Sequence, residues 1–320
     1  MTKPNYGQTV RLTVAQAILK FISAQYSVSD GVRRRFVPAA MGIFGHGNVA
    51  GLGQALDQYS DILPFVQGRN EQGLAHAATA FAKQSKRKQV IAVTASVGPG
   101  SMNMVTAAAL ATVNRVPLLL LPGDVYITRR QGPVLQQLED PSAPDISSND
   151  AFRPVSKFFD RITRPEQLLY SLPQAFRVLA SPTDTGAVVI SLPQDIQSHA
   201  FDFPVEFFAE REWKIRRPVP AQDDVDAVAK LLASAKNPVI IAGGGITYSG
   251  ATAELEALAN ATGIPVCETF GGQSAVQNPG DWFMHGIGLE GAPNTNKLVA
   301  KADVVLSIGT RLTDFATASQ

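Results

Sequence analysis

Glu71 is the carboxylate with the clearest chemical setting in this sequence. It follows a Gly-Arg-Asn loop and begins an Ala-rich stretch, Glu71–Lys83, that is predicted to be helical. In one interpretation it is a first-turn glutamate that stabilises the helix dipole by about 0.5 kcal/mol. In the other, its apolar neighbours bury the carboxyl group, which then hydrogen-bonds a nitrogen atom of a ligand. The residues alone leave both interpretations open.

Two glycine-containing loops follow predicted strands elsewhere in the chain. Gly45-His46-Gly47-Asn48 follows the apolar stretch Val37–Phe44, and Ser96-Val97-Gly98-Pro99-Gly100 follows the predicted strand Val90–Ala95. Glycines allow a ligand to approach the backbone, and the start of the next helix offers free N–H groups. The carboxyl ends of parallel strands meet at one edge of a sheet, so we expect both loops and Glu71 to converge on one crevice. Each loop alone is more often a turn, whereas their joint occurrence favours a shared site.

Other patterns that could carry chemistry are weaker. Gly243-Gly244-Gly245 lies between a predicted strand and a helix, and it is either a tight turn or a loop that admits a phosphate or an adenosine. Gly286–Gly291 matches Gly-x-Gly-x-x-Gly, but Asp281–His285 before it is a poor strand, so we expect a turn-rich loop. The four histidines show no metal-ligand spacing with one another or with Cys267, and no metal site is predicted.

Composition and charge exclude several classes of protein. With 320 residues, 45% hydrophobic and 17% charged, the chain is predicted to fold into about two domains. The net charge of +1 gives no surplus that would attract nucleic acid or an anionic membrane. No apolar run approaches the roughly 20 residues that span a bilayer, and no signal segment is seen. We therefore expect a cytoplasmic protein with no nucleic-acid or membrane partner.

Short apolar runs alternate with longer amphipathic stretches along the whole chain. This alternation predicts an α/β fold with two doubly wound parallel-sheet domains, each covered by helices on both faces. Thr13 and Gln16 fit a capping box at the start of the first helix. Prolines separated by charged residues indicate a linker over residues 201–222. We expect a first domain over residues 1–200 and a second over residues 223–320. Because no closing helix follows its last strand, we expect the second domain to be incomplete.

The order of these motifs resembles a known enzyme family. Gly68-Arg69-Asn70-Glu71-Gln72-Gly73, followed by Thr94–Asn103, resembles the pyrimidine-binding domain of thiamine-diphosphate enzymes of the acetolactate synthase superfamily. The segment after the linker, up to Gly309-Thr310-Arg311, resembles their Rossmann-like central domain. Within that superfamily, Phe44–Gly53 and Leu121–Val125 resemble the hydrolases that open a cyclic diketone in inositol catabolism.

The resemblance implies a function and a role for each matching residue. The implied reaction is hydrolytic C–C cleavage of 3D-trihydroxycyclohexane-1,2-dione, a small-molecule substrate, to 5-deoxy-glucuronate. Glu71 would be the catalytic residue, whose carboxyl group hydrogen-bonds N1′ of the aminopyrimidine of thiamine diphosphate. The other residues implied to line the cofactor pocket are Gly45, His46, Gly47, Pro99 and Asn103.

One part of the family's pattern has no clear counterpart. The family binds the diphosphate and Mg²⁺ through a Gly-Asp-Gly motif and a later asparagine, in a third domain. Gly123-Asp124-Val125 and Asn149 have a similar spacing, but the third glycine is missing and the intervening stretch is Pro-rich. We therefore expect the diphosphate-binding domain to be absent and the metal ligands to lie outside this chain. A homo-oligomer or a separate subunit would then supply them.

Two alternatives remain open at this point. A carboligase or decarboxylase like acetolactate synthase would share the same motifs. A non-catalytic nucleotide-binding module would keep the fold without the chemistry; the missing Gly-Asp-Gly motif favours it, whereas Glu71 and both loops oppose it.

Overall fold

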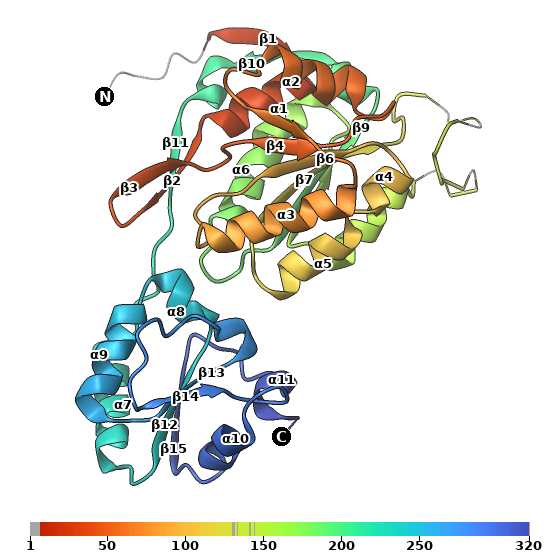
Figure 1. Ribbon diagram of the computed structural model, residues 1–320. Coiled ribbons are helices and arrows are strands. Elements are labelled where there is room, and N and C mark those ends of the chain that lie inside the picture. Colours follow the sequence, from red (N-terminus) through yellow and green to blue (C-terminus); the bar gives the residue numbers. More distant parts are fainter. Residues whose placement is uncertain (1–6, 130–131, 133, 141, 144, 320) are drawn as a thin grey trace. The chain divides into compact units, whose positions relative to one another are not determined.

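The chain folds into two compact units, one ending at Arg216 and the other beginning at Arg217. The computed structural model describes residues 7–129, 132, 134–140, 142–143 and 145–319. Both units are α/β structures built on a parallel sheet, as Figure 1 shows. The predicted fold class is confirmed.

A six-stranded parallel sheet forms the centre of the first unit. Its strands, in spatial order, are β5 (Phe65–Gln67), β4 (Ala40–Gly42), β6 (Ala92–Ala95), β7 (Leu118–Asp124), β9 (Ala187–Pro193) and β8 (Phe158–Arg161). Every residue of β6, β7 and β9 is buried, because helices cover both faces of the sheet.

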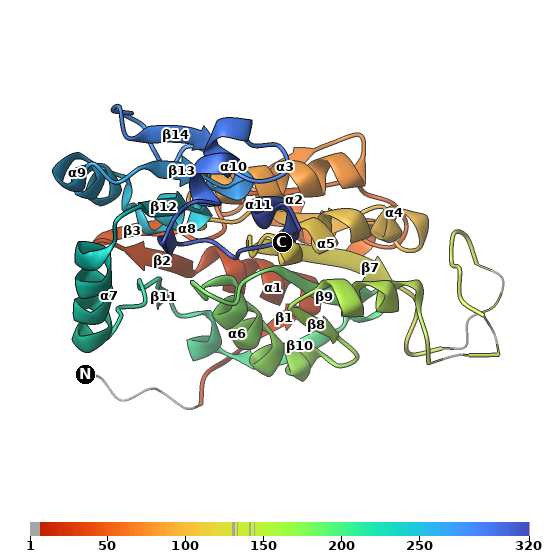
Figure 2. The same ribbon diagram turned by 90° about the horizontal axis from the view of Figure 1, so that it is seen from below.

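Helices lie on both faces of this sheet (Figure 2). The helices on each face bury a separate apolar cluster. One face is covered by α1 (Val14–Ser23), α2 (Gln54–Gln58) and α6 (Leu168–Leu179). The other is covered by α3 (Glu71–Gln84), the short α4 (Pro99–Met102) and α5 (Val105–Val113). Helix α1 begins with the predicted capping box, in which Thr13 and Gln16 exchange hydrogen bonds of 2.9 and 3.2 Å.

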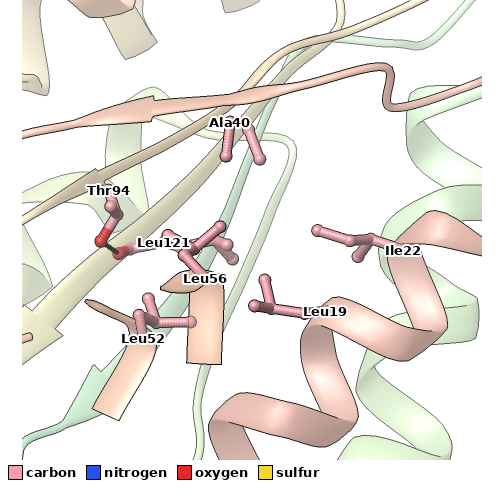
Figure 3. A pocket seen from close by; sticks show the side chains of 8 residues that line it. Leu19, Ile22, Ala40, Leu52, Leu56, Thr94 and Leu121 are labelled. Atoms are coloured by element: carbon pink, nitrogen blue, oxygen red, sulfur yellow. Dashed lines mark hydrogen bonds between the residues drawn. The ribbon is translucent and has the colours of Figure 1, made fainter. Parts of the chain in front are cut away.

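The core between α1, α2 and the sheet contains a small apolar pocket. Leu19 and Ile22 of α1 face Leu52, Leu56 and Leu121 across it, as Figure 3 shows. None of its lining side chains is titratable. The pocket is therefore a feature of core packing and offers no group for acid–base chemistry.

Residues expected to form the linker carry strands of the first unit instead. Strand β10 (Ala200–Pro204) pairs antiparallel with β1 (Thr9–Thr13). Strand β11 (Arg211–Lys214) pairs with β2 (Gln25–Ser29), which in turn pairs with β3 (Val32–Arg35). The prolines indicated a linker, but the aromatic side chains of Phe203 and Phe207 in the same stretch are buried in the core of the first unit.

A four-stranded parallel sheet forms the second unit. Its strands, in spatial order, are β14 (Phe283–Gly286), β13 (Val266–Glu268), β12 (Pro238–Ala242) and β15 (Val304–Ile308). Its helices are α7 (Gln222–Ser234), α8 (Gly244–Ser249), α9 (Thr252–Thr262), α10 (Pro293–Val299) and α11 (Asp314–Thr317).

The strand β14 corrects one expectation from the sequence. Residues 281–285 were expected to be a poor strand, yet β14 pairs with β13 through a register irregularity between Val266 and Glu268. Trp282 is buried beside it and fixes its start. The Gly-x-Gly-x-x-Gly segment that follows forms turns before α10, as predicted. Across the described part of the chain, no helix has the length and apolar character needed to cross a membrane.

Candidate functional site

The carboxyl edge of the first sheet brings the two predicted glycine loops together. The N–H of Gly47, after β4, donates to Ser96 Oγ, after β6, at 3.2 Å. A Cβ atom on Gly45 would lie 2.6 Å from Ser96 Oγ, and one on Gly47 would lie 2.5 Å from the nitrogen of Val97. These approaches leave no room for side chains, so both glycines are required by the contact between the loops. The two loops therefore meet at this edge of the sheet.

Glu71 lies in the first turn of α3 but does not cap it. The N-cap is Asn70, whose Oδ1 accepts a hydrogen bond from the N–H of Gly73 at 2.8 Å. The half-buried Glu71 points instead toward the α4–α5 turn, where its Oε2 accepts from Asn103 Nδ2 at 3.0 Å. Its carboxylate thus contacts a segment 32 positions away in the chain. This contact goes beyond what a first-turn glutamate needs for interaction with the helix dipole.

The Ser96–Gly100 loop connects Glu71 to the Gly45–Gly47 loop. A Cβ atom on Gly100 would lie 3.3 Å from Glu71 Oε1 and 3.6 Å from Ser96 Cβ. The same Ser96 side chain contacts Gly45 on its other side. The glutamate and both glycine loops therefore occupy one continuous region at the sheet edge.

The remaining residues assigned from the sequence lie in the same loops. Pro99 begins α4 and is exposed. His46 is half-buried, and its Nε2 is buried with no hydrogen-bond partner among the described residues. A buried polar atom without a partner is uncommon and requires an explanation. A ligand atom held in this loop would provide one.

Asn48 is a residue of this region to which the sequence analysis assigned no role. Its side chain is buried, its Oδ1 accepts from the N–H of Gly45 at 2.9 Å, and its Nδ2 donates to Thr94 Oγ1 at 3.1 Å. It thereby fixes the loop that carries His46 to strand β6. An asparagine directly after a Gly-x-Gly turn is the signal that could have identified it, because such side chains bond to nearby backbone groups.

Asp124 and Asn149, whose spacing resembles part of a metal motif, do meet in the structure. Asp124 is fully buried at the end of β7, where it accepts from Arg161 Nε at 2.8 Å and from Ser191 Oγ. Asn149 donates to the carbonyl of Gly123 at 2.9 Å and to Ser191 Oγ at 2.8 Å. Both side chains are therefore used in a hydrogen-bond network within the protein.

Asp150 extends this network to the surface. Arg161 also bonds Asp150 at 3.0 Å. Partial burial opposes ionisation of Asp150, but hydrogen bonds from Arg153, the Ser147 N–H and Arg161 outweigh it and lower the pKa of this carboxyl group. No group of three or more acidic, histidine or cysteine side chains within the described residues could hold a metal ion.

The glycine loops of the second unit are explained by packing. A Cβ atom on Gly243 would lie 2.4 Å from the carbonyl oxygen of Gly309, and one on Gly244 would lie 2.6 Å from that of Gly271. The N–H of Gly245 donates to the Gly309 carbonyl at 2.9 Å. These contacts support the tight-turn interpretation of the three glycines.

Cys267 of the same unit is buried, and burial raises its pKa to about 12, so it is not a thiolate nucleophile at neutral pH.

Comparison with known proteins agrees with this architecture. Residues 29–143 match the N-terminal TPP binding domain of thiamine pyrophosphate enzymes, and residues 225–320 match their central domain. The chain is 51% identical over 313 residues to proteins named 3D-(3,5/4)-trihydroxycyclohexane-1,2-dione hydrolase from Bacillus cereus (strain AH820), Bacillus anthracis (strain A0248) and Bacillus thuringiensis (strain Al Hakam).

These alignments cover 98% of this chain and 49% of each relative. The chain thus spans about half the length of the curated relatives it matches. Both of its units correspond to domains of one enzyme family, in the order in which the two matches occur along the sequence. The chain belongs to the thiamine pyrophosphate enzyme family, of which it carries the N-terminal TPP binding domain and the central domain.

Proposed function

We propose that this chain supplies the glutamate half of a thiamine diphosphate site in a hydrolase of inositol catabolism. The reaction is hydrolytic C–C cleavage of 3D-trihydroxycyclohexane-1,2-dione to 5-deoxy-glucuronate. The observation that carries the proposal is the Glu71 carboxylate, held by Asn103 where the strand-end loops converge. The identity of 51% to hydrolases named for this dione supports the choice of substrate.

The surroundings of Glu71 fit the aminopyrimidine ring of the cofactor. A carboxyl group is a suitable partner for a ring nitrogen, and Asn103 bonds only one of its two oxygens, Oε2. Gly100 presents no side chain to Oε1, so no methyl group at this position stands between the carboxyl group and a flat ring. The unpartnered Nε2 of His46 provides a further polar atom in the same region. We propose that Gly45, Gly47 and Pro99 complete the pocket wall.

The same residues do not fit the diphosphate and its Mg²⁺. Mg²⁺ takes oxygen ligands, and Asp124, the acidic residue with the suggestive spacing, is engaged with Arg161 and Ser191. We therefore propose that ligands for the metal and the diphosphate come from polypeptide outside this chain. A homo-oligomer or a separate subunit in the cytoplasm would provide them.

Within this proposal, the residues of the chain hold and move a proton. Bound thiamine diphosphate supplies a nucleophilic carbon and an electron sink for breaking a C–C bond beside a carbonyl group. The Glu71 carboxyl group holds a proton at N1′ of the aminopyrimidine, as a general acid–base residue. Asn103 keeps Oε2 occupied, so that Oε1 is the oxygen that meets the ring nitrogen.

The proposal is tested by a substrate panel with a complete enzyme. This chain is combined with the half of the Bacillus cereus relative that it does not match, in the presence of thiamine diphosphate and Mg²⁺. We expect consumption of the cyclic dione and formation of 5-deoxy-glucuronate. Formation of acetolactate from pyruvate, with the dione unchanged, would instead show a carboligase. Turnover of neither substrate by a complex that binds the cofactor would contradict both assignments.

A further inference from the structure

Gln197 is a buried side chain that has no role in the proposed site as described so far. It lies in the short helical turn Ile196–Ser198, directly after β9, and it is only 1% exposed. Its Nε2 donates to the carbonyl of Gly47 at 2.7 Å and to that of Leu192 at 2.9 Å. Its Oε1 accepts from the N–H of Leu52 at 3.2 Å. One amide thus joins the end of β9 to both ends of the segment Gly47–Leu52.

The segment wraps closely around this amide. A Cβ atom on Gly51 would lie 2.3 Å from Gln197 Oε1 and 2.4 Å from its Cβ. Gly51 also lies in a π-helical turn, Val49–Gly53. Turns of this kind are rare and occur frequently at functional sites. The glycine and the glutamine are therefore matched in shape, which indicates that the loop conformation depends on the side chain.

The amide fixes the backbone next to His46. The peptide groups of Gly47 are held on both sides, because its N–H donates to Ser96 Oγ and its C=O accepts from Gln197. His46 immediately precedes this point and carries the buried, unpartnered Nε2. The ring therefore starts from a backbone position that has little freedom to move.

We propose that Gln197 is a positioning residue for the ligand pocket. It holds the loop Gly45–Gly53 against Ser96 and thereby presents His46 to the ligand that Glu71 binds. This inference rests on the proposed function for the identity of the ligand, but the loop itself can be measured without any ligand. A purely structural role, in which the amide only satisfies buried carbonyl groups, makes a different prediction.

Gln25 offers a matched control for this role. It too is fully buried, with Nε2 donating to the Phe21 carbonyl at 2.7 Å and Oε1 accepting from Trp213 Nε1 at 3.0 Å. It belongs to strand β2, which pairs with β3 and β11 and not with the strands that carry the loops. Gln25→Met and Gln197→Met both replace a buried amide by an apolar group of similar length.

Hydrogen exchange on the full chain separates the two roles. We expect Gln197→Met to accelerate exchange of the amides of residues 45–53 by about tenfold or more, since a buried hydrogen-bond partner is lost. Gln25→Met lowers the melting temperature similarly but leaves that segment protected. Equal protection of residues 45–53 in both variants would overturn the proposal. Should Gln197→Met fail to fold, Gln197→Glu keeps the acceptor for Leu52, removes the donor to Gly47 and is subject to the same comparison.

A second readout connects the loop to the ligand. The second experiment uses the complex with the other half of the Bacillus cereus relative. Because the loop Gly45–Gly53 is no longer held in place, we expect Gln197→Met to weaken thiamine diphosphate binding at least about fivefold more than Gln25→Met does. Equal affinities despite a released loop would also overturn the positioning role. If the wild-type complex bound no thiamine diphosphate, the proposed function would fail, whereas the exchange experiment would still decide whether Gln197 holds the loop.

Discussion

Both units of this protein place glycine-rich loops at the carboxyl ends of parallel strands, but the loops of the two units contact different groups. In the first unit, Gly45 and Gly100 flank Ser96 and the carboxylate of Glu71. In the second, Gly243 and Gly244 abut the backbone of neighbouring loops. Glycine-rich strand ends therefore do not by themselves identify a ligand site. In the first unit the loops contact the Glu71 carboxylate, which bonds the Asn103 side chain, whereas the buried Glu268 of the second unit accepts from the backbone N–H of Val276.

The two units also differ in how completely they are packed. The central strands of the first sheet are buried at every residue. In the second unit, α7 has no buried residue, and alternate residues of β15 are exposed. Regions with few buried apolar contacts open locally at lower free energy. We therefore expect the first unit to be the more rigid one, as a site for a precisely oriented cofactor requires.

The largest effect is expected for Glu71→Gln. An amide cannot hold and release a proton as a carboxyl group does, so kcat of the complete enzyme should fall by at least about 100-fold. Glu166→Gln is the matched control, because Glu166 is also a first-turn glutamate and forms an ion pair with exposed Arg164. Steady-state kinetics and a melting curve are measured for each. Equal activity of the two variants would mean that Glu71 is an ordinary helix-start residue.

Arg161→Met should give the largest loss of stability. It leaves the fully buried Asp124 without its cationic partner, which costs about 3–5 kcal/mol. Arg11→Met is the control, since Arg11 pairs with Asp202 at the exposed surface, where such pairs contribute about 0–1 kcal/mol. Urea unfolding measures both. Similar free energies of unfolding for the two variants would contradict the structural role assigned to Asp124.

Alanine substitutions of two glycines sharpen the contrast between the units. In the complex with the other half of the Bacillus cereus relative, Gly100→Ala places a methyl group 3.3 Å from Glu71 Oε1 and should weaken cofactor binding about tenfold, with little loss of stability. Gly243→Ala forces a methyl group to 2.4 Å from a carbonyl oxygen and should destabilise the second unit by about 1–3 kcal/mol. Calorimetry and hydrogen exchange report the two effects. If Gly243→Ala weakened cofactor binding more than Gly100→Ala, the contrast would be wrong.

A smaller effect is expected on the stability of the protein at acidic pH when Asp150 is replaced. The pKa of Asp150 is lowered in the folded state, so its contribution is present above the unfolded value of about 3.9 and is lost as the pH falls through the folded value. Asp150→Asn should therefore reduce stability at pH 6 and flatten its decrease below about pH 4. Urea midpoints measured from pH 6 to pH 2.5 would show it. A parallel pH profile for the variant would contradict this reading of the network.

The smallest effect is expected at Cys267. Because burial raises its pKa to about 12, the folded protein at pH 8 should not react with a thiol reagent on the timescale of minutes. Unfolding in urea should release one reactive thiol. Rapid labelling of the folded chain would show that the second unit opens more readily than its core suggests.

The sequence predicted most of the fold because its main elements are locally encoded. The Ala-rich helices and the buried strands have clear periodicity, and the capping box of Thr13 and Gln16 appears as expected. Long-range pairing was less accessible: the prolines around β10 and β11 indicated a linker, whereas strand partners about 190 positions earlier in the chain hold both strands in place. No local sequence pattern indicates which distant strand such a segment pairs with.

The candidate site shows the same division. Glu71 and Asn103 could be selected by type and motif, but their mutual hydrogen bond depends on how α3 and the α4–α5 turn meet. Gln197 could not be selected at all, because its role depends on Gly47 and Leu52, about 150 residues away in sequence. Motifs thus identify groups that touch a ligand more readily than groups that position them.

The most direct test of the central claim is a calorimetric titration with thiamine diphosphate and Mg²⁺. The chain is titrated alone, and again with the half of the Bacillus cereus relative that it does not match. We predict no metal-dependent binding by the chain alone and tight, metal-dependent binding by the combination, because the proposed function assigns Glu71 to this chain and the metal ligands to polypeptide outside it. Tight metal-dependent binding by this chain alone would contradict the account and return Asp124 and Asn149 to consideration as ligands.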